Sequence, residues 1–247
     1  MHIRIIIPTT AADHVEPDWY DDLGRPGTRL THVNIERGPR SIESELDEAL
    51  AVASMLEQVA VAATEDVDAI VIDCMGDPGL AAARELVSLP VVGPAQASMH
   101  LAASLAHSFT ILTVLDTLGP MFDQLAHRSG LAGKLRSTRS VQIPVLELRN
   151  EPEHLMQALI EQSLLAIEQD DAHAIIFGCT GMKGYATRLA RELELRGHPR
   201  IPVIDPIRAA IALAETLVAL GLTHSGQTYP TPPAKEYAGY ELSFNPG

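Results

Sequence analysis

The segment Asp68–Gly76, DAIVIDCMG, occurs a second time with few changes, as HAIIFGCTG at His173–Gly181. Ala, Ile, Cys and Gly occupy identical positions in the two copies, so that Cys74 and Cys179 are equivalent residues. Each copy is a short apolar run that ends in a Cys–x–Gly turn, which is typical of a buried parallel strand and the turn after it. We infer an internal duplication in which each half carries one cysteine at a strand end.

The repeat extends beyond these segments. LPVVGPAQASMHLAASLA, from Leu89, resembles IPVIDPIRAAIALAETLV, from Ile201, and RIIIPTT from Arg4 and TILTVLDT from Thr110 are expected to open the two halves. Short β-branched runs that alternate with longer helical patterns predict an α/β fold. We expect two pseudo-symmetric lobes, each a parallel, flavodoxin-like sheet flanked by helices. Their predicted limits are residues 1–93 plus 205–247 for the first lobe and 94–204 for the second.

The pattern also predicts individual elements. Ser41–Ala63 is expected to be a long amphipathic helix with Ser41 or Ser44 as its N-cap. Two further helices are predicted at Leu155–Gln169 and Met182–Arg196. The predicted strands are His2–Ile7, Leu30–Ile35, Ala69–Asp73, Val91–Val92, Phe109–Val114, Ser140–Ile143, Ala174–Gly178 and Val203–Ile204.

Composition narrows the class of protein. The chain has 247 residues, of which 46% are hydrophobic, enough to bury a sizeable core. Its formal net charge of -14 disfavours nucleic acids and anionic membranes as partners. Its apolar runs are far shorter than the roughly 20 residues that span a bilayer, and the N-terminus does not resemble a signal peptide, so we expect a cytoplasmic protein. Neither cysteine has a Cys or His at metal-ligand spacing, and no nucleotide-binding motif is visible, so no metal or cofactor is predicted.

The two Cys–x–Gly turns suggest one chemistry. Ligands of open α/β sheets bind outside the carboxyl ends of the strands, so we expect both turns to face one cleft. Each cysteine is expected to lead into a helix. In one half Asp77 is the expected N-cap and Pro78 the first helical residue, and in the other Thr180 either caps the helix or donates a hydrogen bond to the ligand. The helix N-terminus would favour a thiolate.

Two cysteines in these positions could remove a proton from a carbon beside a carbonyl and return one on the opposite face, which is racemisation. The alternative is that each cysteine is only a small apolar residue at a strand end.

Several motifs resemble the aspartate/glutamate/hydantoin racemase superfamily, and the hydantoin racemase branch in particular. The resemblance covers nearly the whole chain, and CMGDPGL at Cys74–Leu80 is its most specific part. It implies facing pseudo-symmetric lobes, no cofactor, and a two-base mechanism with Cys74 and Cys179 as the bases. The other similar segments are IIIPTT at Ile5–Thr10, GPRSIESELDEAL at Gly38–Leu50 and GCTGM at Gly178–Met182.

The resemblance also bears on the substrate. Amino-acid racemases of the superfamily typically have Asn-Thr after the first cysteine, whereas this chain has Met75–Gly76. A neutral ring carbonyl compound, such as a 5-substituted hydantoin or allantoin, is therefore favoured over aspartate or glutamate. We also expect a homo-oligomer. The predicted substrate contacts are Pro8, Thr9, Thr10, Met75, Gly76, Gln96, Thr180 and Gly181.

Three alternatives stay open: an aspartate or glutamate racemase, a related isomerase or decarboxylase that uses one thiol, and a non-catalytic protein that binds a small ligand on the same scaffold. Asp73 also has two interpretations. Its carboxylate either faces the cleft, where it would raise the pKa of Cys74 and disfavour anionic substrates, or faces away as a strand-end polar group. Tyr229, Tyr237 and Tyr240 belong to a Pro-rich C-terminal segment that either wraps over a lobe or a partner subunit or forms a disordered tail.

Overall fold

The protein is described by a computed structural model that covers residues 1–233, 235, 236 and 238. The chain divides into two compact units. Unit 1 consists of Met1–Ile42, Leu46–Gly93 and the chain from Ala210 onward, and unit 2 consists of Glu43–Glu45 and Pro94–Ala209. The lobe limits predicted at 93/94 and 204/205 stay predictions. The predicted tyrosines Tyr237 and Tyr240 lie outside the described residues.

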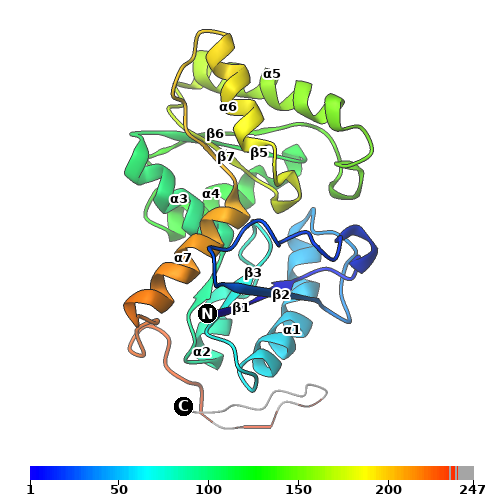
Figure 1. The fold of residues 1–247 in the computed structure, drawn as a ribbon, viewed down its shortest axis with the longest axis vertical. Coiled ribbons are helices and arrows are strands. Elements are labelled where there is room, and N and C mark those ends of the chain that lie inside the picture. Colours follow the sequence, from blue (N-terminus) through cyan, green and yellow to red (C-terminus); the bar gives the residue numbers. More distant parts are fainter. Residues whose placement is uncertain (234, 237, 239–247) are drawn as a thin grey trace. The chain divides into compact units, whose positions relative to one another are not determined.

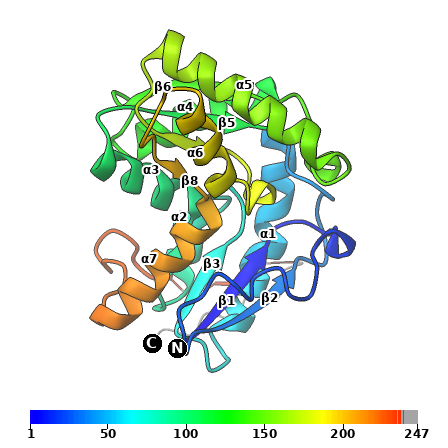
Figure 2. The ribbon, with the colours of Figure 1, turned by 45° about the horizontal axis from the view of Figure 1, so that its top comes forward.

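Unit 1 contains a four-stranded sheet in the order β2-β1-β3-β4, and every pair of neighbouring strands is parallel. Figure 2 shows β1 between β2 and β3. The central strand β3 is apolar and buried along its whole length, as expected for a parallel sheet covered by helices. The strands are β1 (His2–Ile7), β2 (Arg29–Asn34), β3 (Ala69–Ile72) and β4 (Val91–Val92), and the unit also holds α1 (Glu45–Ala62) from Leu46 onward, α2 (Leu80–Leu86) and the end of α7 (Pro206–Leu220).

Unit 2 repeats this topology, with a parallel sheet in the order β6-β5-β7-β8. Figure 1 shows α5 and α6 on one face of this sheet and α3 and α4 on the other. The strands are β5 (Phe109–Thr113), β6 (Leu135–Ser140), β7 (Ile175–Phe177) and β8 (Val203–Ile204), and the helices are α3 (Pro94–Leu105), α4 (Gly119–Arg128), α5 (Pro152–Asp170) and α6 (Ala186–Leu195).

The sheet registers confirm the α/β duplication predicted from the repeat. Ile70 of β3 pairs with Arg4 and with Val91, while Ile175 of β7 pairs with Thr110 and with Val203. The third strand of each sheet is therefore the strand that leads to a cysteine. The opening strands predicted from RIIIPTT and TILTVLDT are β1 and β5.

The strand predicted at Ser140–Ile143 is wrong. The strand in this region, β6, runs from Leu135 to Ser140, and Gln142 has a φ of +57°, which ends extended structure there. The sequence of β6, LRSTRS, is polar because β6 is an edge strand whose side chains bond to neighbouring polar groups, such as Asp170. A search for apolar runs in the sequence does not identify a polar edge strand of this kind.

Two helices begin later than predicted. Helix α1 begins at Glu45 rather than Ser41, so Ser41 is not its N-cap. Helix α6 begins at Ala186, because a 3-10 turn, η4 (Thr180–Met182), is followed by Gly184 with a φ of +90°. A left-handed residue interrupts a right-handed helix, and glycine adopts that conformation at little steric cost.

The apolar core of unit 1 fixes α1 against one face of the sheet. Met55 and Val59 of α1 are completely buried and belong to one cluster with Ile6, Ile70 and Ile72. Side chains four residues apart lie on one face of a helix, so α1 presents a continuous apolar stripe. Burial of each large side chain stabilises the fold by about 1.5–3 kcal/mol.

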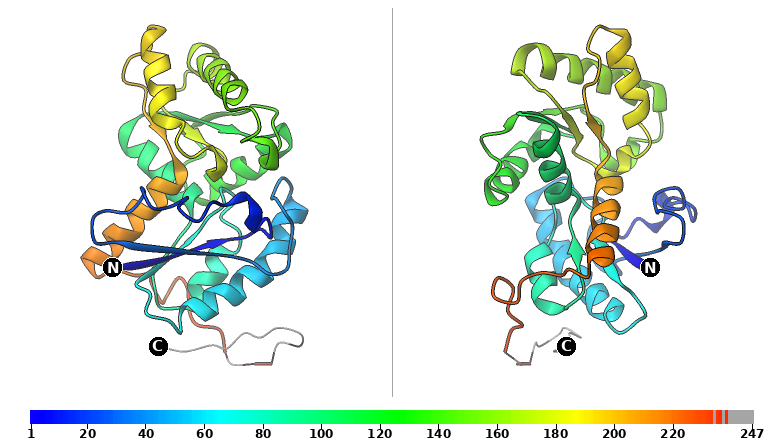
Figure 3. Two further views of the ribbon diagram at one scale, coloured as in Figure 1. Left: turned by 45° about the vertical axis from the view of Figure 1, so that its right-hand side comes forward. Right: turned by 60° about the vertical axis from the view of Figure 1, so that its left-hand side comes forward.

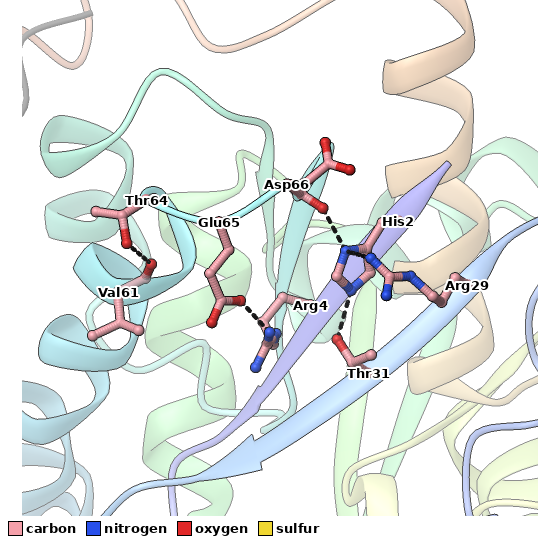
Figure 4. Close-up of polar contacts among 8 residues, drawn as sticks. All are labelled: His2, Arg4, Arg29, Thr31, Val61, Thr64, Glu65 and Asp66. Atoms are coloured by element: carbon pink, nitrogen blue, oxygen red, sulfur yellow. Dashed lines mark hydrogen bonds and ion pairs between the residues drawn. The ribbon is translucent and has the colours of Figure 1, made fainter.

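Polar groups gather at the amino ends of the unit 1 strands, away from the strand ends that carry the cysteine turn (Figure 4). The Nε2 atom of His2 lies 2.7 Å from Oγ1 of Thr31, and Nδ1 lies 2.7 Å from a guanidinium nitrogen of Arg29. Arg4 forms an ion pair with Glu65. These contacts join β1, β2 and the segment before β3, so their role is structural.

The segment after α7 belongs to unit 1 and can be followed in Figure 3. Val91 donates its backbone N–H to Nε2 of His224 at 2.8 Å, and Arg84 donates to the Tyr229 hydroxyl at 3.1 Å. The Arg84 guanidinium also lies 5.4 Å from the centre of the Tyr229 ring. This part of the predicted wrapping segment therefore packs against α2 and β4. Within the described residues, no helix combines the length and the apolar character needed to cross a lipid bilayer.

Candidate active site

Cys74 follows the fully buried strand β3 at the carboxyl end of the unit 1 sheet. Its backbone N–H donates to the carbonyl of Ile72 at 2.9 Å, and its own carbonyl accepts from the N–H of Asp77 at 3.0 Å. The half-buried side chain packs against the core cluster that contains Ile70 and Ile72. The backbone N–H of Gly76 donates to the Cys74 sulfur at 3.4 Å. The turn therefore places one backbone donor within reach of the Cys74 sulfur.

Cys179 has the equivalent position in unit 2. The residue before it, Gly178, donates its N–H to the carbonyl of Leu112 at 2.6 Å. A Cβ atom at Gly178 would lie 2.8 Å from Cβ of Thr113, so a side chain cannot be placed there without moving β5. The Cys179 carbonyl accepts from the N–H of Met182 at 3.1 Å, as the Cys74 carbonyl accepts from Asp77.

The turn after Cys179 brings its backbone close to the sulfur. A Cβ atom added at Gly181 would lie 3.4 Å from the Cys179 sulfur. Gly181 has the place in unit 2 that Gly76 has in unit 1, two residues after the cysteine. The Gly of each Cys–x–Gly turn therefore lies close to the sulfur of the cysteine two residues before it.

The predicted helix starts at the two turns are wrong. Helix α2 begins at Leu80, after Gly79 in the left-handed conformation, so Asp77 is not its N-cap and Pro78 is not its first residue. Thr180 begins a 3-10 turn rather than α6. Neither cysteine directly precedes an α-helix, so neither thiol has the helix N-terminus that the sequence led us to expect.

The other predicted site residues are divided between the units. In unit 1, Pro8, Thr9 and Thr10 follow β1 at the same edge of the sheet as Cys74, because β1 and β3 are parallel. The segment is held by Thr10, whose N–H donates to the Pro39 carbonyl at 2.9 Å. Met75 and Gly76 are both buried in the cysteine turn of unit 1. Gln96, Thr180 and Gly181 belong to unit 2, where Gln96 lies in the first turn of α3 and all three are half-buried.

Sequence reasoning did not find Asn34 and Tyr20. Asn34 ends β2, and its side-chain amide donates to the Thr9 carbonyl at 3.0 Å, which fixes the loop after β1. Tyr20 is 2% exposed and donates a hydrogen bond to the carboxylate of Asp73. Asp73 therefore has a partner within unit 1, while Cys74 packs against a different set of side chains. Only the strong polarity of Asn34 at a strand end could have pointed to it in the sequence.

Among the described residues, no three His, Cys, Asp or Glu side chains are grouped so that they could hold a metal ion.

Comparison with known proteins gives a consistent result. The family described as Asp/Glu/Hydantoin racemase matches residues 17–214. A hydantoin racemase of Pseudomonas sp. (strain NS671) is 37% identical over 247 residues, which is 99% of this chain and 97% of that protein. A hydantoin racemase of Paenarthrobacter aurescens is 35% identical over 241 residues, 96% of this chain and all of that protein. The structure of allantoin racemase from Klebsiella pneumoniae is similar over the whole of both chains, with 36% identity and a TM-score of 0.91.

Proposed function

Because the chain belongs to the Asp/Glu/Hydantoin racemase family, we propose that it is a cofactor-independent racemase in which Cys74 and Cys179 are the two bases. One observation carries the proposal. The sequence places a thiol at the carboxyl end of the third strand in each of two sheets of identical topology, and each thiol is half-buried beside a Gly that lets the backbone approach the sulfur. A purely apolar role would not require the same Cys–x–Gly geometry twice.

In the proposed reaction, one cysteine is a thiolate and the other a thiol. The thiolate removes the proton from a carbon beside a carbonyl group, and the electron pair moves onto the carbonyl oxygen to give an enolate. The thiol on the opposite face then gives its proton to the same carbon, which inverts the configuration and leaves the protonation states exchanged. Backbone N–H groups at the turns would stabilise the enolate oxygen.

The proposed substrate is a 5-substituted hydantoin or an allantoin-like compound. The named relatives act on compounds of this kind, since two are hydantoin racemases and one is an allantoin racemase. The turn after Cys74 also has Met75 and Gly76, and Met75 is 3% exposed, so it offers no charged group for an amino acid. Thr9, Thr10, Thr180 and Gln96 are the polar groups that we propose as contacts to the ring.

Two cysteine variants test the mechanism. Cys74→Ser and Cys179→Ser should each reduce kcat for racemisation of a hydantoin by at least 10³-fold, because a hydroxyl is far less acidic than a thiol. In deuterated water each variant should still exchange the acidic hydrogen of one enantiomer, and the two variants should prefer opposite enantiomers.

Other outcomes would favour the alternatives. Full racemisation by both single variants would rule out the two-base mechanism. Loss of activity in only one variant would favour an isomerase or decarboxylase that uses one thiol. Saturable ligand binding by the unmodified protein without deuterium exchange would favour a non-catalytic binding protein. Racemisation of aspartate or glutamate, but of no ring compound, would assign the amino-acid branch.

The assembly and the compartment are also proposals. We propose a homo-oligomer in the cytoplasm. Light scattering after size-exclusion chromatography would measure the mass of the particle against the 26.6 kDa chain, and cell fractionation would show the compartment.

A further inference from the structure

The two cysteine turns differ in where a buried carboxyl group is attached. The third residue after the cysteine is Asp77 in unit 1 and Met182 in unit 2. The residue after the fourth strand is Gly93 in unit 1 and Asp205 in unit 2. Each unit therefore has one aspartate at one of these two positions. In unit 1 the aspartate is on the cysteine turn, and in unit 2 it is at the end of the fourth strand.

In unit 1 the Asp77 carboxyl fills the place where a side chain at residue 93 would begin. A Cβ atom at Gly93 would lie 2.4 Å from Cγ and Oδ1 of Asp77 and 2.6 Å from Oδ2. Asp77 is 8% exposed, and its N–H donates to the Cys74 carbonyl at 3.0 Å. The carboxyl group thus joins the cysteine turn to the end of β4.

In unit 2 the carboxyl group reaches the turn from the other side. Asp205 is 6% exposed, and its Oδ2 atom accepts the backbone N–H of Gly184 at 3.2 Å. Burial raises the pKa of Asp205, while the backbone N–H groups of Gly184, Arg208 and Ile207 oppose that rise. At the equivalent turn position, Met182 is completely buried and carries no charge.

A short chain of backbone contacts links Gly184 to the catalytic candidate. Lys183 donates its N–H to the carbonyl of Thr180 at 3.1 Å, and Met182 donates to the carbonyl of Cys179 at 3.1 Å. The 3-10 turn is therefore closed at its start by Cys179 and fixed beyond its end by Asp205. If the second anchor is lost, the turn is free to move away from the sulfur.

We propose that Asp205 is the positioning residue for Cys179 and that Asp77 has the same role for Cys74, each fixing its cysteine turn against the end of the neighbouring strand. The catalytic meaning of this role rests on the proposed function, but the positional claim does not. Neither residue is a catalytic group, since each acts through the turn.

The test compares the reactivity of the two thiols in one sample. Asp205→Ser keeps a hydroxyl that can cap α7 but is too short to hold Gly184, whereas Asp205→Asn keeps an oxygen at the right distance. Native protein is treated with iodoacetamide at pH 7.5, and alkylation of each cysteine is followed by peptide mass spectrometry. Asp205→Ser should slow alkylation of Cys179 at least fivefold and change the alkylation rate of Cys74 by less than twofold. Asp205→Asn should restore the Cys179 rate to at least half of that in the protein without substitutions.

The mirrored variant and a control complete the design. Asp77→Ser should slow the alkylation of Cys74 and not that of Cys179. Glu215→Gln is the control, because Glu215 is a buried carboxylate of α7, 1% exposed, that bonds to Arg25 and Thr28 instead of a cysteine turn. It should lower stability and change neither thiol rate by more than twofold.

An unchanged or faster Cys179 reaction in Asp205→Ser, an equal fall at both cysteines, or no recovery in Asp205→Asn would overturn the proposal. If the protein is a racemase, Asp205→Ser should also lower kcat at least tenfold with KM within threefold. If the protein racemises no compound tested, the proposed function is wrong. The alkylation rates would still decide whether Asp205 positions Cys179.

Discussion

The hydroxyl group of Tyr20 donates a hydrogen bond to the carboxylate of Asp73, the residue that precedes Cys74. The two residues are 53 positions apart in the chain, and both are at least nine-tenths buried. The Tyr20 ring also lies against His32, with 5.2 Å between the ring centres. The pair therefore ties the loop after β1 and the strand β2 to the end of β3, where the first candidate base lies.

Tyr20→Phe should lower the free energy of unfolding by about 1–3 kcal/mol, because it removes a donor from a buried carboxylate. Urea unfolding followed by circular dichroism would measure the change. Tyr185→Phe is the matched control, since the half-buried Tyr185 hydroxyl makes no hydrogen bond within the described part of the chain. Equal effects of the two substitutions would contradict a specific role for the Tyr20–Asp73 contact.

Gly93→Ala should destabilise the protein by about 1–3 kcal/mol, because the new methyl group would overlap the Asp77 carboxyl. Thermal unfolding would report the loss as a lower Tm. Gly133→Ala should be nearly neutral, since nothing lies within 4 Å of a Cβ atom at that position. The double variant Gly93→Ala with Asp77→Ala should recover part of the stability. No recovery would show that Asp77 is not the group that excludes a side chain at 93.

The stability of the protein should fall between about pH 6.5 and pH 4 because of His224. Burial of this half-buried ring lowers its pKa from 6.5 to about 4. Above pH 6.5 the ring is neutral in both folded and unfolded chains, and stability is complete. Below that pH, His224 binds a proton in the unfolded chain, whereas in the folded chain it stays neutral down to about pH 4. Stability is therefore lost over this pH range.

The loss attributable to His224 should be about 1 kcal/mol, after allowance for the solvent that reaches the ring. His224→Gln should flatten the fall in stability measured by urea unfolding at several pH values, because glutamine has no proton to gain. His100→Gln is the control, since His100 is an exposed residue of α3. An unchanged pH profile in His224→Gln would contradict the assignment.

Arg139→Gln should lower stability by about 1–3 kcal/mol at pH 7, because it leaves the Asp170 carboxylate without its main partner. Arg139 donates to both Asp170 oxygens, at 2.6 and 2.9 Å, and the side chains are each about a fifth exposed. Arg136→Gln should change stability by less than 1 kcal/mol, since the Arg136–Asp171 ion pair is exposed.

The same substitution should change the response to acid. The hydrogen bond from Arg139, and then that from Ser137, lower the pKa of Asp170 in the folded protein. This carboxylate therefore contributes stability that is present above the unfolded pKa of about 3.9 and is lost as the pH falls below it. Arg139→Gln should reduce the loss of stability below pH 4, and an unaltered acid profile would contradict this explanation.

Much of the fold could be predicted from local patterns. The apolar runs around Ile70 and Ile175 identify the buried central strands, and their likeness reveals the duplication and the place of the two cysteines. The prediction failed for β6, because an edge strand needs no apolar run, and at the helix starts after Cys74 and Cys179. There Gly79 and Gly184 adopt left-handed conformations that the residue types allow but do not require.

By itself, the sequence determined which residues lie inside and which positions in the two halves are equivalent, because burial imposes a periodic pattern that can be read along the chain. Only the tertiary structure decided which side chains support the turns. The contacts of Tyr20 with Asp73 and of Asp205 with Gly184 join residues that are 53 and 21 positions apart. A buried polar group must find a partner, but its identity depends on which distant segment the packed sheet brings within about 3 Å.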